Sequence, residues 1–207
     1  MKGSLTVIAF FVLGCLLGYT RWLPQALLEN DWTAWILYAL MFQVGLSIGS
    51  DKKLKDILRS IKPKLLLIPL ATIIGTLSFS ALAALLLHKW SLWNCLAVGS
   101  GFAYYSLSSL LITEIMTPVL GPLAAELGTL ALMTNVIREI MALLLAPALV
   151  KYVGKVAPIC AGGVTSMDTT LPVISQYAGK DMVFLAIFHG VLLDISVPFF
   201  VSFFCSL

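Results

Sequence analysis

The sequence predicts an all-α, polytopic membrane protein. Of its 207 residues, 60% are hydrophobic and 11% charged, and the mean hydropathy is +1.01. No soluble domain of this size needs so much apolar sequence, and the long apolar runs match the length of a bilayer-spanning helix. We expect about seven membrane segments, at residues 5–20, 32–49, 65–87, 92–112, 122–150, 157–178 (the weakest) and 182–205.

A basic loop at residues 50–64 sets the expected orientation. Six of the 13 Lys and Arg residues fall in it, which is typical of a cytoplasmic loop obeying the positive-inside rule rather than of a nucleic-acid surface. If all seven segments cross, the N-terminus is inside and the C-terminus outside. The five tryptophans would then flank outer loops as interfacial anchors.

The segment 162–172, Gly-Gly-Val-Thr-Ser-Met-Asp-Thr-Thr-Leu-Pro, is hostile to a helix yet lies among apolar segments. Backbone of this kind is tolerated at membrane depth only where protein or a wet cavity surrounds it, and transporters hold cargo at such breaks. Polar and charged residues concentrate in the second part of the chain. We therefore divide it into scaffold helices at 1–91 and a transport core at 92–207.

Asp168 is the most specific candidate within this broken segment. The hydroxyls of Thr165, Ser166 and Thr169 surround it in the sequence, and the glycines permit unwinding. A carboxylate beside hydroxyls and freed carbonyls suits a cation: Na⁺, a proton or an ammonium group. The alternative is a helix cap or hinge carboxylate.

A second candidate group lies in the middle of segment 122–150. Asn135 and Glu139 are four residues apart and share a helix face, whereas Arg138 points about 100° away from Glu139. A charge at the bilayer centre costs about 2.5–3.5 kcal/mol or more, so these side chains must face protein or water. The alternative is a structural ion pair of Arg138 with one of three acids: Glu114, Glu126 or Asp168.

Four further residues are supporting candidates. Glu126 lies about three helical turns from Glu139 and would line the same path, whereas Glu114 is expected at the inner interface. His189 is either a proton relay or a packing histidine. Tyr104 and Ser106 belong to the glycine- and hydroxyl-rich stretch 99–109, which is either a second unwound element or a tightly packed helix.

Enzyme and metal motifs are missing from the sequence. The four cysteines are isolated, without a CxxC pair or a Cys/His metal spacing, and they read as core-filling thiols. There is no HExxH, no GxSxG elbow and no glycine-rich phosphate loop. We therefore expect neither an enzyme nor a bound cofactor.

Several stretches resemble the LysO-type lysine exporter family of bacterial inner membranes: 100–114 (SGFAYYSLSSLLITE), 135–150, 160–173 (CAGGVTSMDTTLPV) and 181–190. The resemblance implies export of L-lysine and its toxic analogue thialysine. Glu139 and Asp168 match two acidic residues important in that family. It also implies a core of crossed, interrupted helices like that of sodium/proton antiporters and bile-acid symporters.

The chain departs from the family in one respect, because single-chain exporters carry a further N-terminal bundle. The resemblance therefore implies a short partner membrane subunit or a homo-oligomer. Coupling to H⁺ or Na⁺ is expected. Two alternatives remain open: a Na⁺/H⁺ antiporter or Na⁺-coupled organic-solute carrier of similar architecture, and a non-transporting membrane subunit of a partner.

Overall fold

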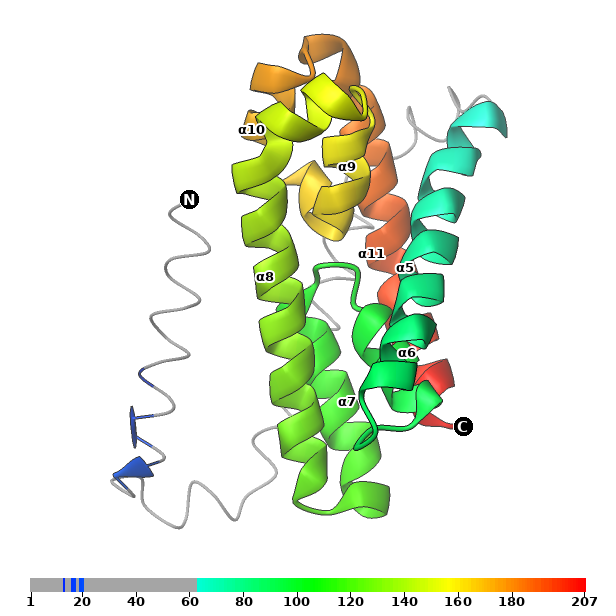
Figure 1. Ribbon diagram of the computed structural model, residues 1–207, viewed down its shortest axis with the longest axis vertical. Helices are drawn as coiled ribbons and strands as arrows, with labels where there is room; N and C mark the ends of the chain where they lie inside the picture. The colour runs from blue at the N-terminus through cyan, green and yellow to red at the C-terminus, as the bar shows by residue number, and fades with distance from the viewer. Residues whose placement is uncertain (1–12, 14–15, 18, 21–62) are drawn as a thin grey trace.

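The computed structural model describes residues 13, 16–17, 19–20 and 63–207, and all regular elements among them are helices (Figure 1). The expected segments 5–20 and 32–49 and the basic loop 50–64 lie almost wholly outside the described residues. The all-helical prediction is confirmed for the part of the chain that is described.

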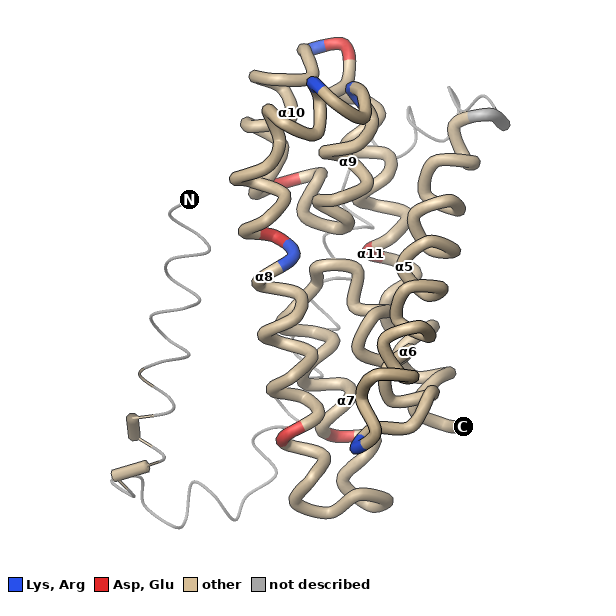
Figure 2. Tube along the Cα trace, in the orientation of Figure 1, with Lys and Arg blue, Asp and Glu red and all other residues tan. Residues whose placement is uncertain are grey.

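Within the described part of the chain, three helices are long and apolar enough to cross a membrane. They are α5 (Leu67–Leu86), α8 (Leu123–Tyr152) and α11 (Val183–Cys205). The 3₁₀ turns η1 (Pro63–Leu66) and η3 (Lys180–Met182) lead into α5 and α11. Each helix has at least the length of about 20 residues that the hydrocarbon requires. Charged residues gather at the two ends of the bundle, and few lie at mid-height (Figure 2).

Segment 92–120 forms a helical hairpin. Helix α6 (Leu92–Gly99) begins at Ser91, whose hydroxyl accepts from the Asn94 N–H at 3.1 Å. It runs parallel to the first half of α8, from the Lys89–Glu126 ion pair up to the Val98 carbonyl, which faces Asn135. Helix α7 (Tyr105–Leu120) then returns antiparallel to the same half of α8.

This hairpin corrects the predicted fourth segment. Residues 92–112 were expected to cross the membrane once, but α6 and α7 begin and end at the same end of the bundle. Of the two alternatives left open for the stretch 99–109, the structure shows the interrupted helix, with the break at residues 100–104. The sequence did not indicate that the chain reverses at this break, because the reversal depends on α6 and α7 both packing against α8.

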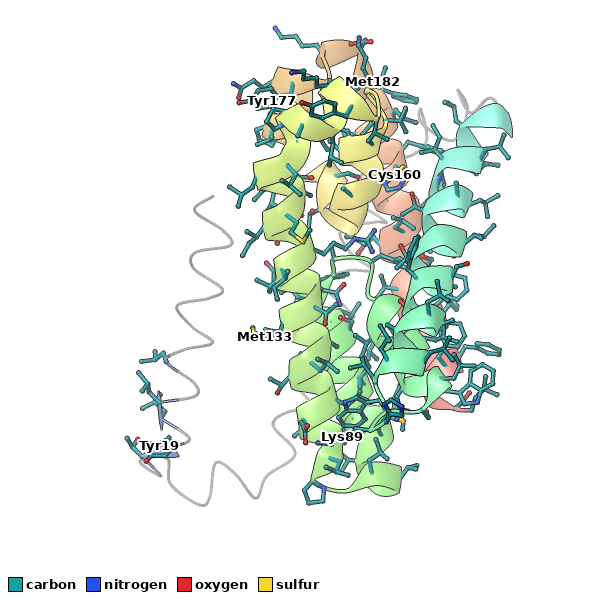
Figure 3. The ribbon with its side chains drawn as sticks, viewed as in Figure 1. Tyr19, Lys89, Met133, Cys160, Tyr177 and Met182 are labelled. Carbon is teal, nitrogen blue, oxygen red and sulfur yellow. The ribbon has the colours of Figure 1, made fainter. Side chains whose placement is uncertain are left out.

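Segment 157–177 forms a second hairpin, which enters from the opposite end. Helix α9 (Ala157–Gly162), the 3₁₀ turn η2 (Gly163–Met167) and α10 (Leu171–Tyr177) make it up. Lys155, before it, pairs with Asp181, after it, at 3.3 Å. Tyr177 and Met182 lie together at that end in Figure 3, far from Lys89. The weak segment 157–178 therefore re-enters rather than crosses.

The tips of the two hairpins meet inside the bundle. The Val164 N–H donates to the Phe102 carbonyl at 2.9 Å. Gly163 has φ +60°, and a Cβ there would collide with the Phe102 carbonyl oxygen, so glycine is required on both grounds. Phe102 and Ala103 themselves have positive φ, 45° and 76°, which marks a strained tip.

Each hairpin is followed by a long helix, and the two units, 92–152 and 157–205, run in opposite directions through the bundle. Inverted units of this kind are a common architecture of transporters, with the site where the units meet. A buried apolar cluster surrounds the first tip, with Phe102, Leu107 and Val197 at its centre. It holds the strained backbone in place.

Candidate functional site

Asn135 fixes the first tip to α8. It is 2% exposed, and its Oδ1 accepts from the Ala103 N–H at 2.7 Å. Its Nδ2 donates to the carbonyls of Ala131 at 2.9 Å and Val98 at 3.4 Å. A buried amide that replaces lost helical partners stabilises an interrupted helix, because unsatisfied backbone groups are costly away from water.

Glu139 lies one helical turn beyond Asn135 on the same face of α8 and is fully buried. Its carboxyl group lies near enough to Asp168 and to the neutral phenol of Tyr105, at the start of α7, for electrostatic interaction. The carboxylate therefore lies between the two hairpins. This is the shared face with Asn135 that the i, i+4 spacing predicted.

Asp168 ends η2, where the backbone leaves the 3₁₀ turn with φ −134° and ψ −89°. Its Oδ1 accepts from the Thr169 N–H, and the Thr169 hydroxyl lies 3.3 Å away. The residue is exposed, in contrast to Glu139. A carboxylate partly satisfied by its own turn and open on its other side is suited to a cationic ligand.

The other hydroxyls of this segment bond to carbonyls. Thr165 donates to the Gly162 carbonyl at 2.8 Å, and Thr170 donates to the Thr165 carbonyl at 2.9 Å. Ser166 donates to the Ala186 carbonyl of α11 at 2.8 Å. These bonds hold the tip in shape, so Thr165 and Ser166 position the segment that carries Asp168.

Arg138 points to the other side of α8, as the helical spacing predicted. Its Nε donates to the Ala161 carbonyl at 3.0 Å, its Nη2 to the Cys160 carbonyl at 3.1 Å, and its Nη1 to the Thr76 hydroxyl at 3.3 Å. The guanidinium thus caps the C-terminal end of α9, where a cation is favoured. The alternative of an ion pair with Glu114, Glu126 or Asp168 is not what the structure shows.

Glu126 and Glu114 lie apart from this group. Glu126 is exposed in the first turn of α8 and pairs with Lys89, and Glu114 is exposed on α7. Because α6 and α7 form a hairpin, both acids lie at the bundle end opposite to Lys155 and Asp181. Tyr104 precedes α7 and its carbonyl accepts from Ser108, while the half-buried Ser106 lies in the first turn.

Asp194 was not selected from the sequence, yet the structure brings it to the site. It is 6% exposed on α11 and lies near enough to Asp168 and to the neutral phenol of Tyr104 for electrostatic interaction. The signal that could have found it is a lone carboxylate in a strongly apolar span, which is a functional candidate by default. Three acids from η2, α8 and α11 therefore approach the two tips.

His189 is fully buried on α11 between two hydroxyls. Its Nε2 lies 2.9 Å from the Thr72 Oγ1 of α5, and its Nδ1 lies 3.2 Å from the Ser166 Oγ of η2. Among the described residues, no group of three or more His, Cys, Asp or Glu side chains is placed to hold a metal ion.

Interrupted hairpins that meet beside buried carboxylates define a multi-pass membrane protein of the transporter class. A family model described as "Lysine exporter LysO" matches residues 8–205, and the chain belongs to this family. No solved structure matches it.

Two relatives carry related names. The lysine exporter LysO of Escherichia coli (strain K12) is 32% identical over 207 residues, which cover 98% of this chain and 64% of that protein. A protein of Haemophilus influenzae (strain ATCC 51907 / DSM 11121 / KW20 / Rd), provisionally named as a lysine exporter, is 28% identical over 205 residues, covering 97% of both chains. This chain therefore spans less than two thirds of the Escherichia coli relative.

Proposed function

We propose that this protein exports L-lysine, and its analogue thialysine, from the cytoplasm across the bacterial inner membrane. The observation that carries the proposal is the convergence of Glu139, Asp168 and Asp194 on the meeting point of two re-entrant hairpins. Family membership supports lysine as the cargo.

The charges of the site suit a dibasic amino acid. At neutral pH lysine carries two ammonium groups, and each needs an anionic or hydrogen-bonding partner once it leaves water. Asp168 and Glu139 come from different hairpin–helix units, so one ligand bound to both would bridge the units. In this proposal they engage the two ammonium groups, or one engages lysine while the other carries a coupling proton.

The arrangement of the hairpins supports translocation rather than binding alone. One hairpin enters from each end of the bundle, and their tips share a single backbone hydrogen bond. Small relative movements of the two units would expose the tips to one side or the other, which is the basis of alternating access. The resemblance to sodium/proton antiporters and bile-acid symporters belongs to this proposal.

Orientation and partners are also proposed. The basic loop 50–64 precedes α5, and this supports a cytoplasmic position for the end of the bundle that holds Lys155 and Asp181, with the C-terminus outside. The outer faces of α5 carry exposed apolar side chains, such as Leu67, Ile74 and Phe79. A short membrane subunit or a second copy of the chain would supply the part of the longer relative that this chain does not match.

Lysine efflux from cells making Asp168→Asn or Glu139→Gln tests the proposal. We expect efflux to fall to that of cells without the protein, because neither amide offers a negative charge. Glu126→Gln is the matched control, since Glu126 is exposed and pairs with Lys89 far from the tips. Wild-type efflux by both amide variants at normal protein levels would remove the proposed roles. Lysine efflux with and without a small multi-span membrane protein, if one is encoded beside this gene, tests the partner.

A further inference from the structure

The environment of His189 contains more hydrogen-bond contacts than a neutral imidazole can satisfy. The Thr72 hydroxyl lies 3.1 Å from the Ile68 carbonyl and 2.9 Å from the Nε2 of His189. The Ser166 hydroxyl lies 2.8 Å from the Ala186 carbonyl and 3.2 Å from the Nδ1.

Counting protons distinguishes the two states of the ring. The four contacts need four protons, and each hydroxyl supplies one. A neutral imidazole adds one proton, which makes three and leaves one contact unsatisfied. An imidazolium adds two, which makes four, so both ring nitrogens donate while both hydroxyls donate to backbone carbonyls.

Burial and the nearby charge of Arg138 disfavour the imidazolium form of His189. His189 is fully buried, and Arg138 is the cation that faces it from α8. The other elements that pack around His189 carry few charges. Helix α5 has no charged side chain, and Asp168 directly follows η2. On α11 itself, Asp194 lies five residues after His189. A ring whose hydrogen bonds favour the charged form while its surroundings disfavour it can both take up and release a proton.

The two hydroxyls connect the ring to functional parts of the molecule. Thr72 lines an open groove of about 560 Å³ between α5, α8 and α9, which is also lined by Arg138. Ser166 belongs to η2 and lies two residues before Asp168. A change of proton at His189 would therefore alter a hydrogen bond to the tip that carries Asp168.

We propose that His189 is the site that binds the coupling proton, taking up one proton to become an imidazolium and returning it when the tip moves. This inference rests on the proposed function and deepens it, because it names His189, rather than Asp168 or Glu139, as the carrier of the counter-ion and leaves both acids to lysine. In the transport cycle the proton binds on one side of the membrane and leaves on the other, in exchange for lysine.

Transport by purified protein in vesicles provides the first test. Exchange of labelled lysine for unlabelled lysine requires no net proton movement. Accumulation of lysine in vesicles with an acidic interior, in contrast, requires protons to leave as lysine enters. We expect His189→Gln to retain exchange, since Gln can still accept from one hydroxyl and donate to the other, and to lose accumulation driven by the pH gradient. His88→Gln is the matched control, because His88 is the other histidine and is exposed.

A direct readout of the proton separates this inference from the proposed function. In the His88→Gln variant labelled with ¹⁵N-histidine, every imidazole signal in the protein comes from His189. We expect the neutral signal to give way to the imidazolium signal as the pH is lowered from about 8 to about 4, since burial and Arg138 disfavour the charged ring. Thr72→Val removes the partner of Nε2, so it should weaken the imidazolium signal at a given pH, and Ser80→Ala on the same helix should not.

Each possible result either supports or overturns His189 as the proton-binding site. Imidazole signals that stay constant across the pH range, or a His189→Gln variant that still accumulates lysine, would overturn the proton site. Loss of both exchange and accumulation in His189→Gln would assign the residue to the framework and also overturn it. Wild-type protein that moves no lysine would instead refute the proposed function, and the ¹⁵N signals would still decide whether His189 binds a proton.

Discussion

The Val164 N–H donates to the Phe102 carbonyl at 2.9 Å, and this bond joins the tips of two hairpins that enter the bundle from opposite ends. The donor lies in η2 and the acceptor between α6 and α7, 62 residues apart by their numbers (164 − 102). The bond therefore reports whether the two units are in register.

Labelling of single cysteines tests the hairpin topology. In a chain whose native cysteines are replaced, we expect His88→Cys and Gly121→Cys to react with a membrane-impermeant maleimide from the same side. Gly154→Cys should react from the opposite side. A single crossing at 92–112 would place positions 88 and 121 on opposite sides, and that labelling pattern would contradict the structure.

Gly163→Ala should abolish transport and lower the thermal stability of the purified protein. A left-handed conformation costs an L-residue about 1–2 kcal/mol, and the new Cβ would also collide with the Phe102 carbonyl oxygen. Gly75→Ala on α5 is the control, because no atom lies within 4 Å of the Cβ it would add. Equal melting temperatures and equal transport for the two variants would contradict the role of Gly163.

Asn135→Ala should destabilise the first tip by about 1–3 kcal/mol, because the Ala103 N–H loses its acceptor in a buried place. Transport should fall with it, since the strained residues 102 and 103 would no longer be fixed to α8. The neighbouring Thr134→Val, at an exposed position, serves as the control. Thermal unfolding and lysine efflux measured on the same preparations would check both effects.

Asp194→Asn should reduce lysine transport while the protein still folds. The carboxylate is 6% exposed beside Tyr104, and the amide keeps its size while removing its charge. Asp181→Asn is the control, because Asp181 is exposed and pairs with Lys155 at the end of the bundle. If the two variants export lysine equally well, Asp194 does not belong to the site.

Arg138→Gln should destabilise the second hairpin more than the first. The guanidinium donates to the Cys160 and Ala161 carbonyls, which end α9 without helical partners, and an amide cannot reach both. We expect backbone amides at residues 157–167 to exchange hydrogen faster in this variant than in the wild type. The amides at residues 92–104 should exchange at the wild-type rate. Uniform exchange across both hairpins would show that Arg138 has no local capping role.

The sequence alone determined the class of protein and predicted several of the polar residues that the structure places near the two tips. Apolar composition predicted the membrane helices, and the helix-breaking run 162–172 predicted the interruption, because backbone and solvation rules act locally. The same local rules placed Asn135 and Glu139 on one helix face and Arg138 on another.

The tertiary structure decided what these local rules leave open. Whether a broken segment continues or turns back depends on which helix its second arm packs against, so the hairpins at 92–120 and 157–177 were not apparent from hydropathy. Asp194 and His189 acquired their places through α11 packing on η2 and α7, contacts between residues distant in sequence. Distances of this kind are set by the packing of the whole bundle rather than by any one segment.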